Sequence, residues 1–217
     1  MITEPDVTFT DYALMLECAV FAYLIYHRGN KDSLYRFWFT VFFISLSLAS
    51  LVGGTVHGFF LDETTFGYQV LWPCSLIAIG LSAVAGWSIG AIILFVGNVR
   101  RAIFIASRIV FVLYCVFVLF VNQHFLIAIL HFVPAALFFF FALLILYRRK
   151  RAPQIMIGAF GLALTFFAPV IQQGRIAIHP VYFNYNALYH AVQALAFFMI
   201  FWAARSLSNK KNEGFNL

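Results

Sequence analysis

Residues 102–147 read AIFIASRIVFVLYCVFVLFVNQHFLIAILHFVPAALFFFFALLILY, an apolar run whose main interruption is VNQHF at residues 121–125. A helix needs about 20 apolar residues to cross a bilayer. The run is therefore too long for one span and long enough for two. We predict a short turn at the interruption, between spanning helices at about 102–121 and 124–147.

Five further stretches of similar length and composition occupy most of the remaining chain. Hydrophobic residues make up 64% of the 217 residues and charged residues only 10%, whereas about 25% of a soluble domain is charged. The expected spans lie at about 8–27, 35–60, 69–96, 153–172 and 184–205. We therefore predict an all-α, polytopic membrane protein, a seven-transmembrane helix bundle that forms a single domain over residues 1–217.

The basic residues cluster at alternate joints between the predicted spans. All Lys and Arg residues except Arg175 belong to the first, third and fifth joints, to the C-terminal tail or to the adjoining half of a span. Because Lys and Arg mark cytoplasmic loops, we expect the N-terminus outside and the C-terminus in the cytoplasm. The tail contributes Arg205, Lys210 and Lys211. The net charge of +6 then reflects topology and contact with anionic membrane lipids, and we expect no nucleic-acid partner.

Polar side chains in the predicted spans gather in the outer half of the bundle. At a rise of 1.5 Å per residue, His57, His190 and His131 lie about 5, 9 and 10 Å from the outer ends of their spans. One segment that concentrates them is SLVGGTVHGFF, residues 50–60. Ser50 and His57 are two helical turns apart there and share one face.

The second polar segment is FNYNALYHAVQ, residues 183–193. Asn186, His190 and Gln193 are spaced by four and three residues, so they also share one helix face. Gln172 ends the sixth predicted span at the same level. Burial alone would not group these side chains, so we predict that they line a binding pocket for a lipid-like small molecule.

The histidines of the two segments suggest a metal. Neutral imidazole is the commonest metal ligand, and catalytic zinc takes three protein ligands with water in the fourth position. We expect His57 and His190 to bind zinc together with His131 or Asp62. Ser50 and Asp62 are the candidate catalytic residues, and the hydroxyl of Ser50 or Thr55 would stabilise an oxyanion beside the metal. The alternative is that the histidines only form hydrogen bonds between helices.

Glu17 is the carboxylate deepest inside a predicted span, about 14 Å from the outer end of the first. A charge at the bilayer centre costs at least about 2.5–3.5 kcal/mol. Three explanations of Glu17 remain open. It forms an ion pair with Arg108, it is a functional carboxylate in the pocket, or its carboxyl is protonated. Asp11 is expected at the interface, near the outer mouth. Cys18, Cys74 and Cys115 do not have the spacing of metal ligands, and we expect them to be small buried packing residues.

The order of these features resembles the superfamily of alkaline ceramidases and progestin/adipoQ receptors. The likeness rests on seven spans, on His57 at the outer end of the second and on His190 in the first half of the seventh. The resemblance implies a membrane hydrolase whose zinc-bound water cleaves lipid amides or esters. GGTVHGF and FNYNALYHAVQ are most similar to an uncharacterised bacterial branch near that superfamily, which implies the bacterial inner (plasma) membrane.

The resemblance extends to individual positions. His57 matches the histidine of the second span, and His190 matches the second histidine of the pair in the seventh. Asn186 stands where the first histidine of that pair is expected, and Gly53 stands where the superfamily has a serine. The acidic residue near the third span has its nearest counterpart in Asp62, which belongs to the preceding loop.

Three functions are compatible with this pattern. The first is metal-dependent hydrolysis of a lipid amide or ester, with zinc as the cofactor. The second is non-enzymatic, a lipid-binding receptor or sensor with a degenerate metal site. The third is a haem electron carrier with His57 and His190 as axial ligands. A retinal protein is disfavoured because the seventh predicted span contains no Lys for a Schiff base. We expect a hydrolase-like pocket, with the lipid-binding protein as the alternative.

Overall fold

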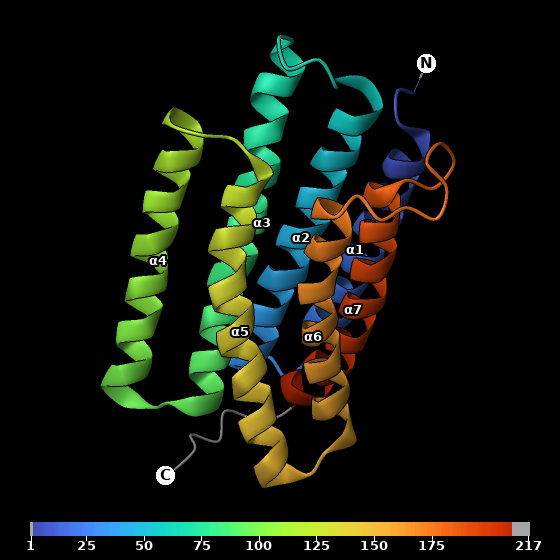
Figure 1. Ribbon diagram of the computed structural model, residues 1–217. Helices are drawn as coiled ribbons and strands as arrows, with labels where there is room; N and C mark the ends of the chain where they lie inside the picture. The colour runs from blue at the N-terminus through green and yellow to red at the C-terminus, as the bar shows by residue number, and fades with distance from the viewer. Residues whose placement is uncertain (1, 210–217) are drawn as a thin grey trace.

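The computed structural model describes residues 2–209, which form a bundle of seven α-helices (Figure 1). The helices are α1 (Pro5–Arg28), α2 (Leu34–Phe59), α3 (Phe66–Leu94), α4 (Gly97–Phe120), α5 (Phe125–Lys150), α6 (Pro153–Gln173) and α7 (Tyr185–Ser208). All seven are long and apolar enough to cross a membrane. The predicted all-α bundle is therefore confirmed for this part of the chain, and it fits a multi-pass membrane protein. Lys210 and Lys211 of the predicted basic tail lie outside the described residues.

The largest difference from the predicted spans is at the start of α4. We expected this helix from about residue 102, but it begins at Gly97, which has a positive φ of 61°. The charged residues Arg100 and Arg101 had suggested a loop. They lie instead in the first turns of the helix, where long basic side chains can extend toward the membrane surface.

The turn between α4 and α5 falls at the predicted break and is built by side-chain caps. The Asn122 side chain accepts a hydrogen bond from the backbone N–H of His124 at 2.7 Å. The Nδ1 atom of His124 in turn accepts from the backbone N–H of Leu126 at 3.2 Å. These bonds satisfy backbone groups that the start of α5 would otherwise leave without a partner.

The helices differ in how far they contribute to the interior. α4 lies at the edge of the bundle and packs against α3 (Figure 1). α1 packs against α2 and α7, and α6 packs against α5 and α7. α1 begins at one end of the bundle and α7 ends at the opposite end. Six helices are therefore placed to enclose a common interior.

Glycines allow the helices that carry the polar residues to approach closely. A Cβ at Gly54 of α2 would lie 2.8 Å from the Cβ of Asp11, and one at Gly58 would lie 3.1 Å from the Thr8 side chain. The two glycines are four residues apart and both face α1. On α6, a Cβ at Gly161 would lie 2.5 Å from a backbone oxygen of α7. α1 and α7 are thus held tightly against their neighbours.

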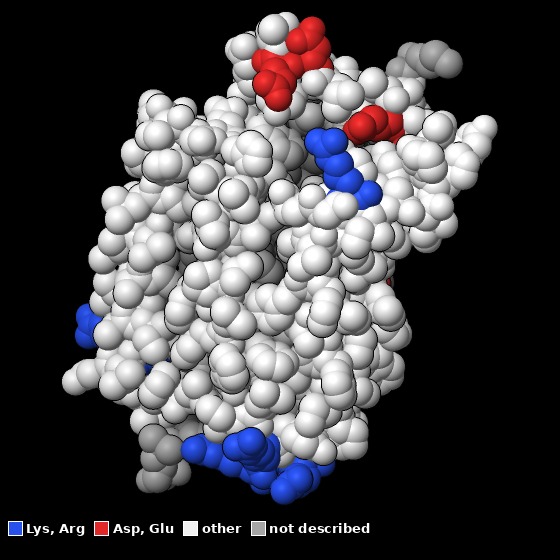
Figure 2. Space-filling model, viewed as in Figure 1, with Lys and Arg blue, Asp and Glu red and all other residues white. Residues whose placement is uncertain are grey.

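The bundle has an aromatic core, and its two ends differ in charge. The side chains of Phe39, Phe43 and Phe139 are fully buried in the main hydrophobic core. Figure 2 shows most of the basic side chains at the end where α5 joins α6, and the acidic ones toward the end where α1 begins. We call these the basic end and the acidic end. The polar interior described next lies in the acidic half.

Candidate functional site

A cavity of about 100 Å³ lies inside the acidic half, between α1, α2, α3, α5, α6 and α7. This volume holds several water molecules or a polar head group. Residues predicted for the site that line it are Ser50, His57, Gln172, Asn186, His190 and Gln193. Toward the middle of the bundle the wall becomes apolar, with Leu14, Leu46, Phe132 and Phe197. We call this cavity the pocket.

His190 and Asp11 face each other in the pocket. The Nε2 atom of His190 lies 3.4 Å from Oδ1 of Asp11, and the two residues are only 7% and 4% exposed. The Nδ1 atom of His190 lies 3.2 Å from the Thr10 hydroxyl. That hydroxyl already donates to the backbone carbonyls of Asp6 and Val7. The Thr10 hydroxyl can therefore accept from His190 when Nδ1 carries the proton.

His190 and Asp11 are two titratable groups in contact inside the pocket. With Nδ1 protonated, a neutral imidazole presents a lone pair at Nε2. An ionised carboxylate would repel that lone pair, so in this tautomer the contact is favourable when a proton lies on Nε2 or on Asp11. The pair is able to give a proton to a bound molecule or to take one from it.

Gly53 leaves the other side of the Asp11 carboxylate open. A Cβ at Gly53 would lie 3.5 Å from Oδ2 of Asp11 and 3.5 Å from Oγ of Ser75. The Ser75 hydroxyl donates to the backbone carbonyl of Ala49 at 3.0 Å, so it can also accept a hydrogen bond. A ligand can thus approach both oxygens from the pocket.

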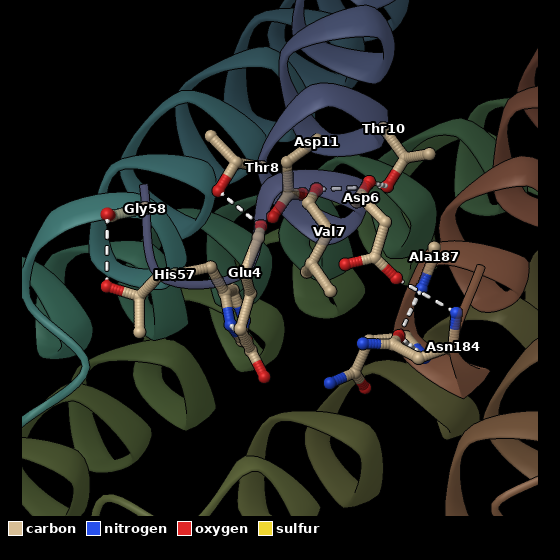
Figure 3. A network of polar contacts seen from close by, with 12 residues as sticks. Glu4, Asp6, Val7, Thr8, Thr10, Asp11, His57, Gly58, Asn184 and Ala187 are labelled. Carbon is tan, nitrogen blue, oxygen red and sulfur yellow. Dashed lines mark hydrogen bonds and ion pairs between the residues drawn. The ribbon is translucent and has the colours of Figure 1, made fainter. Parts of the chain in front are cut away.

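The chain before α1 lies over His57 (Figure 3). Oε2 of Glu4 is 2.6 Å from Nδ1 of His57, and these side chains are 28% and 19% exposed. The backbone N–H of Thr3 donates to the carbonyl oxygen of Gly58 at 3.0 Å. The short N–O distance is typical of a charge-assisted hydrogen bond. His57 is therefore oriented by an acidic partner of its own.

Asp6 and Asn184 position the start of α7 and so the height of His190 (Figure 3). The Asn184 side chain accepts from the backbone N–H groups of Asn186 and Ala187 at 2.9 and 3.1 Å, which is an N-cap. Oδ2 of Asp6 accepts from the backbone N–H of Asn184 at 2.9 Å. This contact ties the beginning of α1 to the beginning of α7.

Two buried amide oxygens in the pocket have no hydrogen-bond partner among residues 2–209. The Nε2 group of Gln172 donates to Oδ1 of Asn186 at 3.1 Å. The Nε2 group of Gln193 donates to the Tyr189 hydroxyl at 3.4 Å. Oε1 of each glutamine is the atom left without a partner. A buried acceptor of this kind costs about 1–3 kcal/mol, and a bound O–H or N–H group would satisfy it.

A family model matches residues 7–209, which is nearly the whole chain. The chain belongs to the DUF6962 family. That family is described as one of unknown function. Searches of curated proteins and of solved structures found no match. The matched region of this DUF6962 protein includes the pocket residues Asp11, His57 and His190.

Two residues predicted as metal ligands, His131 and Asp62, do not line the pocket of the DUF6962 protein. The His131 ring stacks on Tyr114 of α4, with 4.1 Å between the ring centroids. Asp62 is exposed in the loop between α2 and α3, where the backbone N–H and the hydroxyl of Thr64 donate to it. These two hydrogen bonds hold the pKa of the Asp62 carboxyl below its usual range.

Glu17 and Arg108 do not form the ion pair that the sequence left open. Glu17 lies on α1 outside the pocket lining, and its Oε2 is buried without a partner in the described part of the chain. The Arg108 guanidinium lies 5.8 Å from the centroid of the Trp38 ring and 5.9 Å from that of Phe104. This arrangement is a cation–π contact and keeps Arg108 beside α2.

Residues 2–209 contain no group of three or more His, Cys, Asp and Glu residues placed to hold a metal ion. His57 and His190 both line the pocket. Each has a separate acidic partner, Glu4 for His57 and Asp11 for His190. In this arrangement the side chains do not fit a zinc centre, because zinc needs a third protein ligand and none is placed to bind the same ion as both histidines among the described residues.

Asp11 is the pocket residue of the DUF6962 protein that the sequence did not predict. It was expected at the membrane interface, but it is buried against His190. Val7, Leu14 and Cys18 are also buried and follow the same spacing of three and four residues along α1. That periodicity was the available signal, because a residue on the buried face of a helix cannot point to lipid or water.

Proposed function

We propose that this DUF6962 protein is an integral membrane protein that binds an amphiphilic, lipid-like molecule in the pocket. The observation that carries the proposal is the pair of unpartnered amide oxygens on Gln172 and Gln193, beside the Asp11–His190 pair. Buried polar groups normally have partners. A bound molecule with O–H or N–H groups would supply the partners that these two oxygens lack among the described residues.

The chemistry of the wall defines the class of ligand. The polar part of the pocket offers acceptors, namely Oε1 of Gln172 and Gln193 and the Asp11 carboxyl. We therefore expect a head group with hydroxyl or N–H donors. The apolar wall at Phe132 and Phe197 suits an acyl chain, because its burial contributes about 0.8 kcal/mol per CH₂ group.

The proposed orientation puts the pocket in the outer half of the membrane. It rests on the excess of Lys and Arg at the basic end, which marks the cytoplasmic side. The N-terminus is then outside and the C-terminus in the cytoplasm. We propose the bacterial inner membrane as the location, from the resemblance of the sequence to a bacterial branch of seven-helix proteins.

The binding proposal is tested by the lipids that copurify with the protein. Wild type in mild detergent is compared with Ser50→Leu, which places an apolar side chain in the pocket. Ser107→Leu on α4 is the matched control, since Ser107 is equally buried but does not line the pocket. We expect one amphiphile at close to one molecule per chain in wild type and in the control, and its loss in Ser50→Leu. Equal amounts in all three would refute the proposal.

A second candidate function is hydrolysis of a lipid amide or ester. It is favoured by the Asp11–His190 pair, which stands next to the Ser75 and Ser50 hydroxyls in the same pocket. Zinc would make this chemistry easier by activating water. Binding zinc at His57 and His190 would require the side chains to rearrange around a third ligand, so we place hydrolysis second.

The hydrolysis proposal is tested by metal content and turnover measured on the same preparations. Wild type purified with added zinc is compared with His57→Ala and His190→Ala by elemental analysis. The same samples are incubated with an N-acyl amide and an acyl ester of equal chain length. One zinc per chain in wild type, lost in both variants together with hydrolysis, is the supporting result. If wild type contained no zinc and hydrolysed neither substrate, the hydrolysis proposal would be refuted and only the binding proposal would remain.

A further inference from the structure

We propose that the basic end carries a second site, which binds the phosphate group of an anionic lipid. The site lies between the last turns of α1 and α7, at the opposite end of the bundle from the pocket. It does not depend on the function proposed above. Three observations carry the inference: a cavity, two arginines without an acidic partner, and a buried hydroxyl with no hydrogen bond.

The cavity has a volume of about 60 Å³. Its polar wall consists of Arg28 on α1, Arg205 and Ser208 on α7, and Asn209 directly after α7. Leu24 and Phe201 form its apolar wall, one turn further into the bundle. A small polar space that continues into an apolar wall matches the junction between the phosphate and the glycerol backbone of a lipid.

The charge at this site is not balanced by the protein groups described. Neither Arg28 nor Arg205 forms an ion pair with an Asp or Glu among residues 2–209. Each lies in the last turn of its helix, where the helix end contributes roughly −0.5 of an elementary charge. Two guanidinium groups at two helix ends therefore retain a net charge of about +1. One phosphodiester, with a charge of −1, neutralises it, and guanidinium groups bind phosphate oxygens in bidentate geometry.

Ser208 supplies a hydrogen-bond donor beside the two arginines. It is only 1% exposed, and its Oγ has no hydrogen-bond partner in the described part of the chain. Its backbone carbonyl accepts from the N–H of Asn30 at 2.9 Å, which fixes the residue against the loop between α1 and α2. A serine hydroxyl that is held in place and left without an acceptor is able to donate to a phosphate oxygen.

The test measures binding of short-chain lipids to delipidated, full-length protein in a neutral detergent. Phosphatidylglycerol is titrated against wild type and against Arg28→Gln/Arg205→Gln, with native mass spectrometry and thermal stabilisation as readouts. The control is Arg148→Gln/Arg149→Gln, which removes equal charge from the last turn of α5 without touching the cavity. We expect affinity to fall at least about tenfold in the first variant, which corresponds to about 1.4 kcal/mol, and to stay within twofold in the control. Equal loss in both variants, or no loss in either, would overturn the proposal.

Two further arms identify the source of the phosphate. Phosphatidylcholine with the same acyl chains should bind more weakly than phosphatidylglycerol, because its choline group adds a positive charge beside the arginines. Equal affinities would contradict an anion site. Inorganic phosphate at the same concentrations should stabilise the protein less than the lipid does. Equal stabilisation would assign the site to free phosphate and not to a lipid.

Ser208→Ala keeps both arginines and so separates binding from folding. Removing a buried hydroxyl that has no partner should leave the lipid-free protein as stable as wild type or slightly more stable. The same variant should bind phosphatidylglycerol several-fold more weakly. Unchanged affinity would show that the phosphate does not contact the hydroxyl, and would overturn its placement in this cavity.

Discussion

The contacts of His190 determine whether the pocket can exchange a proton with a bound molecule. Nδ1 of His190 lies 3.2 Å from the Thr10 hydroxyl, and Nε2 lies 3.4 Å from Oδ1 of Asp11. Asp11→Asn keeps a donor for Nε2, so we expect it to change the free energy of unfolding by less than about 1 kcal/mol. Asp11→Leu leaves Nε2 without a partner and should destabilise by about 1–3 kcal/mol. Thermal unfolding in detergent measures both, and equal losses would show that the contact between Asp11 and His190 does not contribute to stability.

The contact between Glu4 and His57 is a second prediction at this scale. Glu4→Ala removes the acidic group that covers the His57 ring, so diethylpyrocarbonate should modify His57 several-fold faster. Because both side chains are partly exposed, the change in unfolding free energy should stay below about 1 kcal/mol. Peptide mass spectrometry identifies the modified histidine.

Asp62→Ala is the control for this measurement. It removes an acid from the loop that follows α2 and should leave the His57 rate unchanged. The same result in Asp62→Ala as in Glu4→Ala would point to a general electrostatic effect and not to the contact seen in Figure 3.

At the scale of helices, the crossing of α1 and α2 depends on one of two adjacent glycines. A Cβ at Gly53 would meet its nearest atoms at 3.5 Å, whereas a Cβ at Gly54 would lie 2.8 Å from the Cβ of Asp11. Gly53→Ala should therefore be neutral or stabilising, since alanine favours helix by up to about 1 kcal/mol. Gly54→Ala should destabilise by about 1–3 kcal/mol through overpacking. Unfolding measurements that gave the same value for both would contradict this packing.

The seven helices were predictable because each depends on the hydropathy and length of its own stretch of sequence. The break at VNQHF needed only the fact that 46 residues, 102–147, cannot form one span. The contacts of the site were not predictable in the same way, because they depend on how each helix is rotated about its axis. His131 belongs to α5, in the predicted fifth span, but its ring faces Tyr114. Asp11 was placed at the interface, but α1 turns it toward His190.

The orientation of the whole molecule is a prediction that labelling can test. In a background without Cys18, Cys74 and Cys115, single cysteines are introduced by Glu63→Cys at the acidic end and Arg149→Cys at the basic end. In intact cells, a membrane-impermeant maleimide should label the first variant and not the second. Both should react after the membrane is permeabilised. The reverse pattern in intact cells would invert the topology and place the pocket in the cytoplasmic half.

The central claim for the whole molecule is that the pocket holds a lipid-like ligand. The most direct measurement is photo-crosslinking with a single-chain N-acyl amide that carries a hydroxyl on its head group and a diazirine at the end of its acyl chain. Adducts mapped by mass spectrometry should fall on Phe132 and Phe197 of the apolar wall, and should disappear in Ser50→Leu. Adducts confined to exposed apolar side chains such as Leu113 and Phe141, and unchanged in Ser50→Leu, would contradict the account.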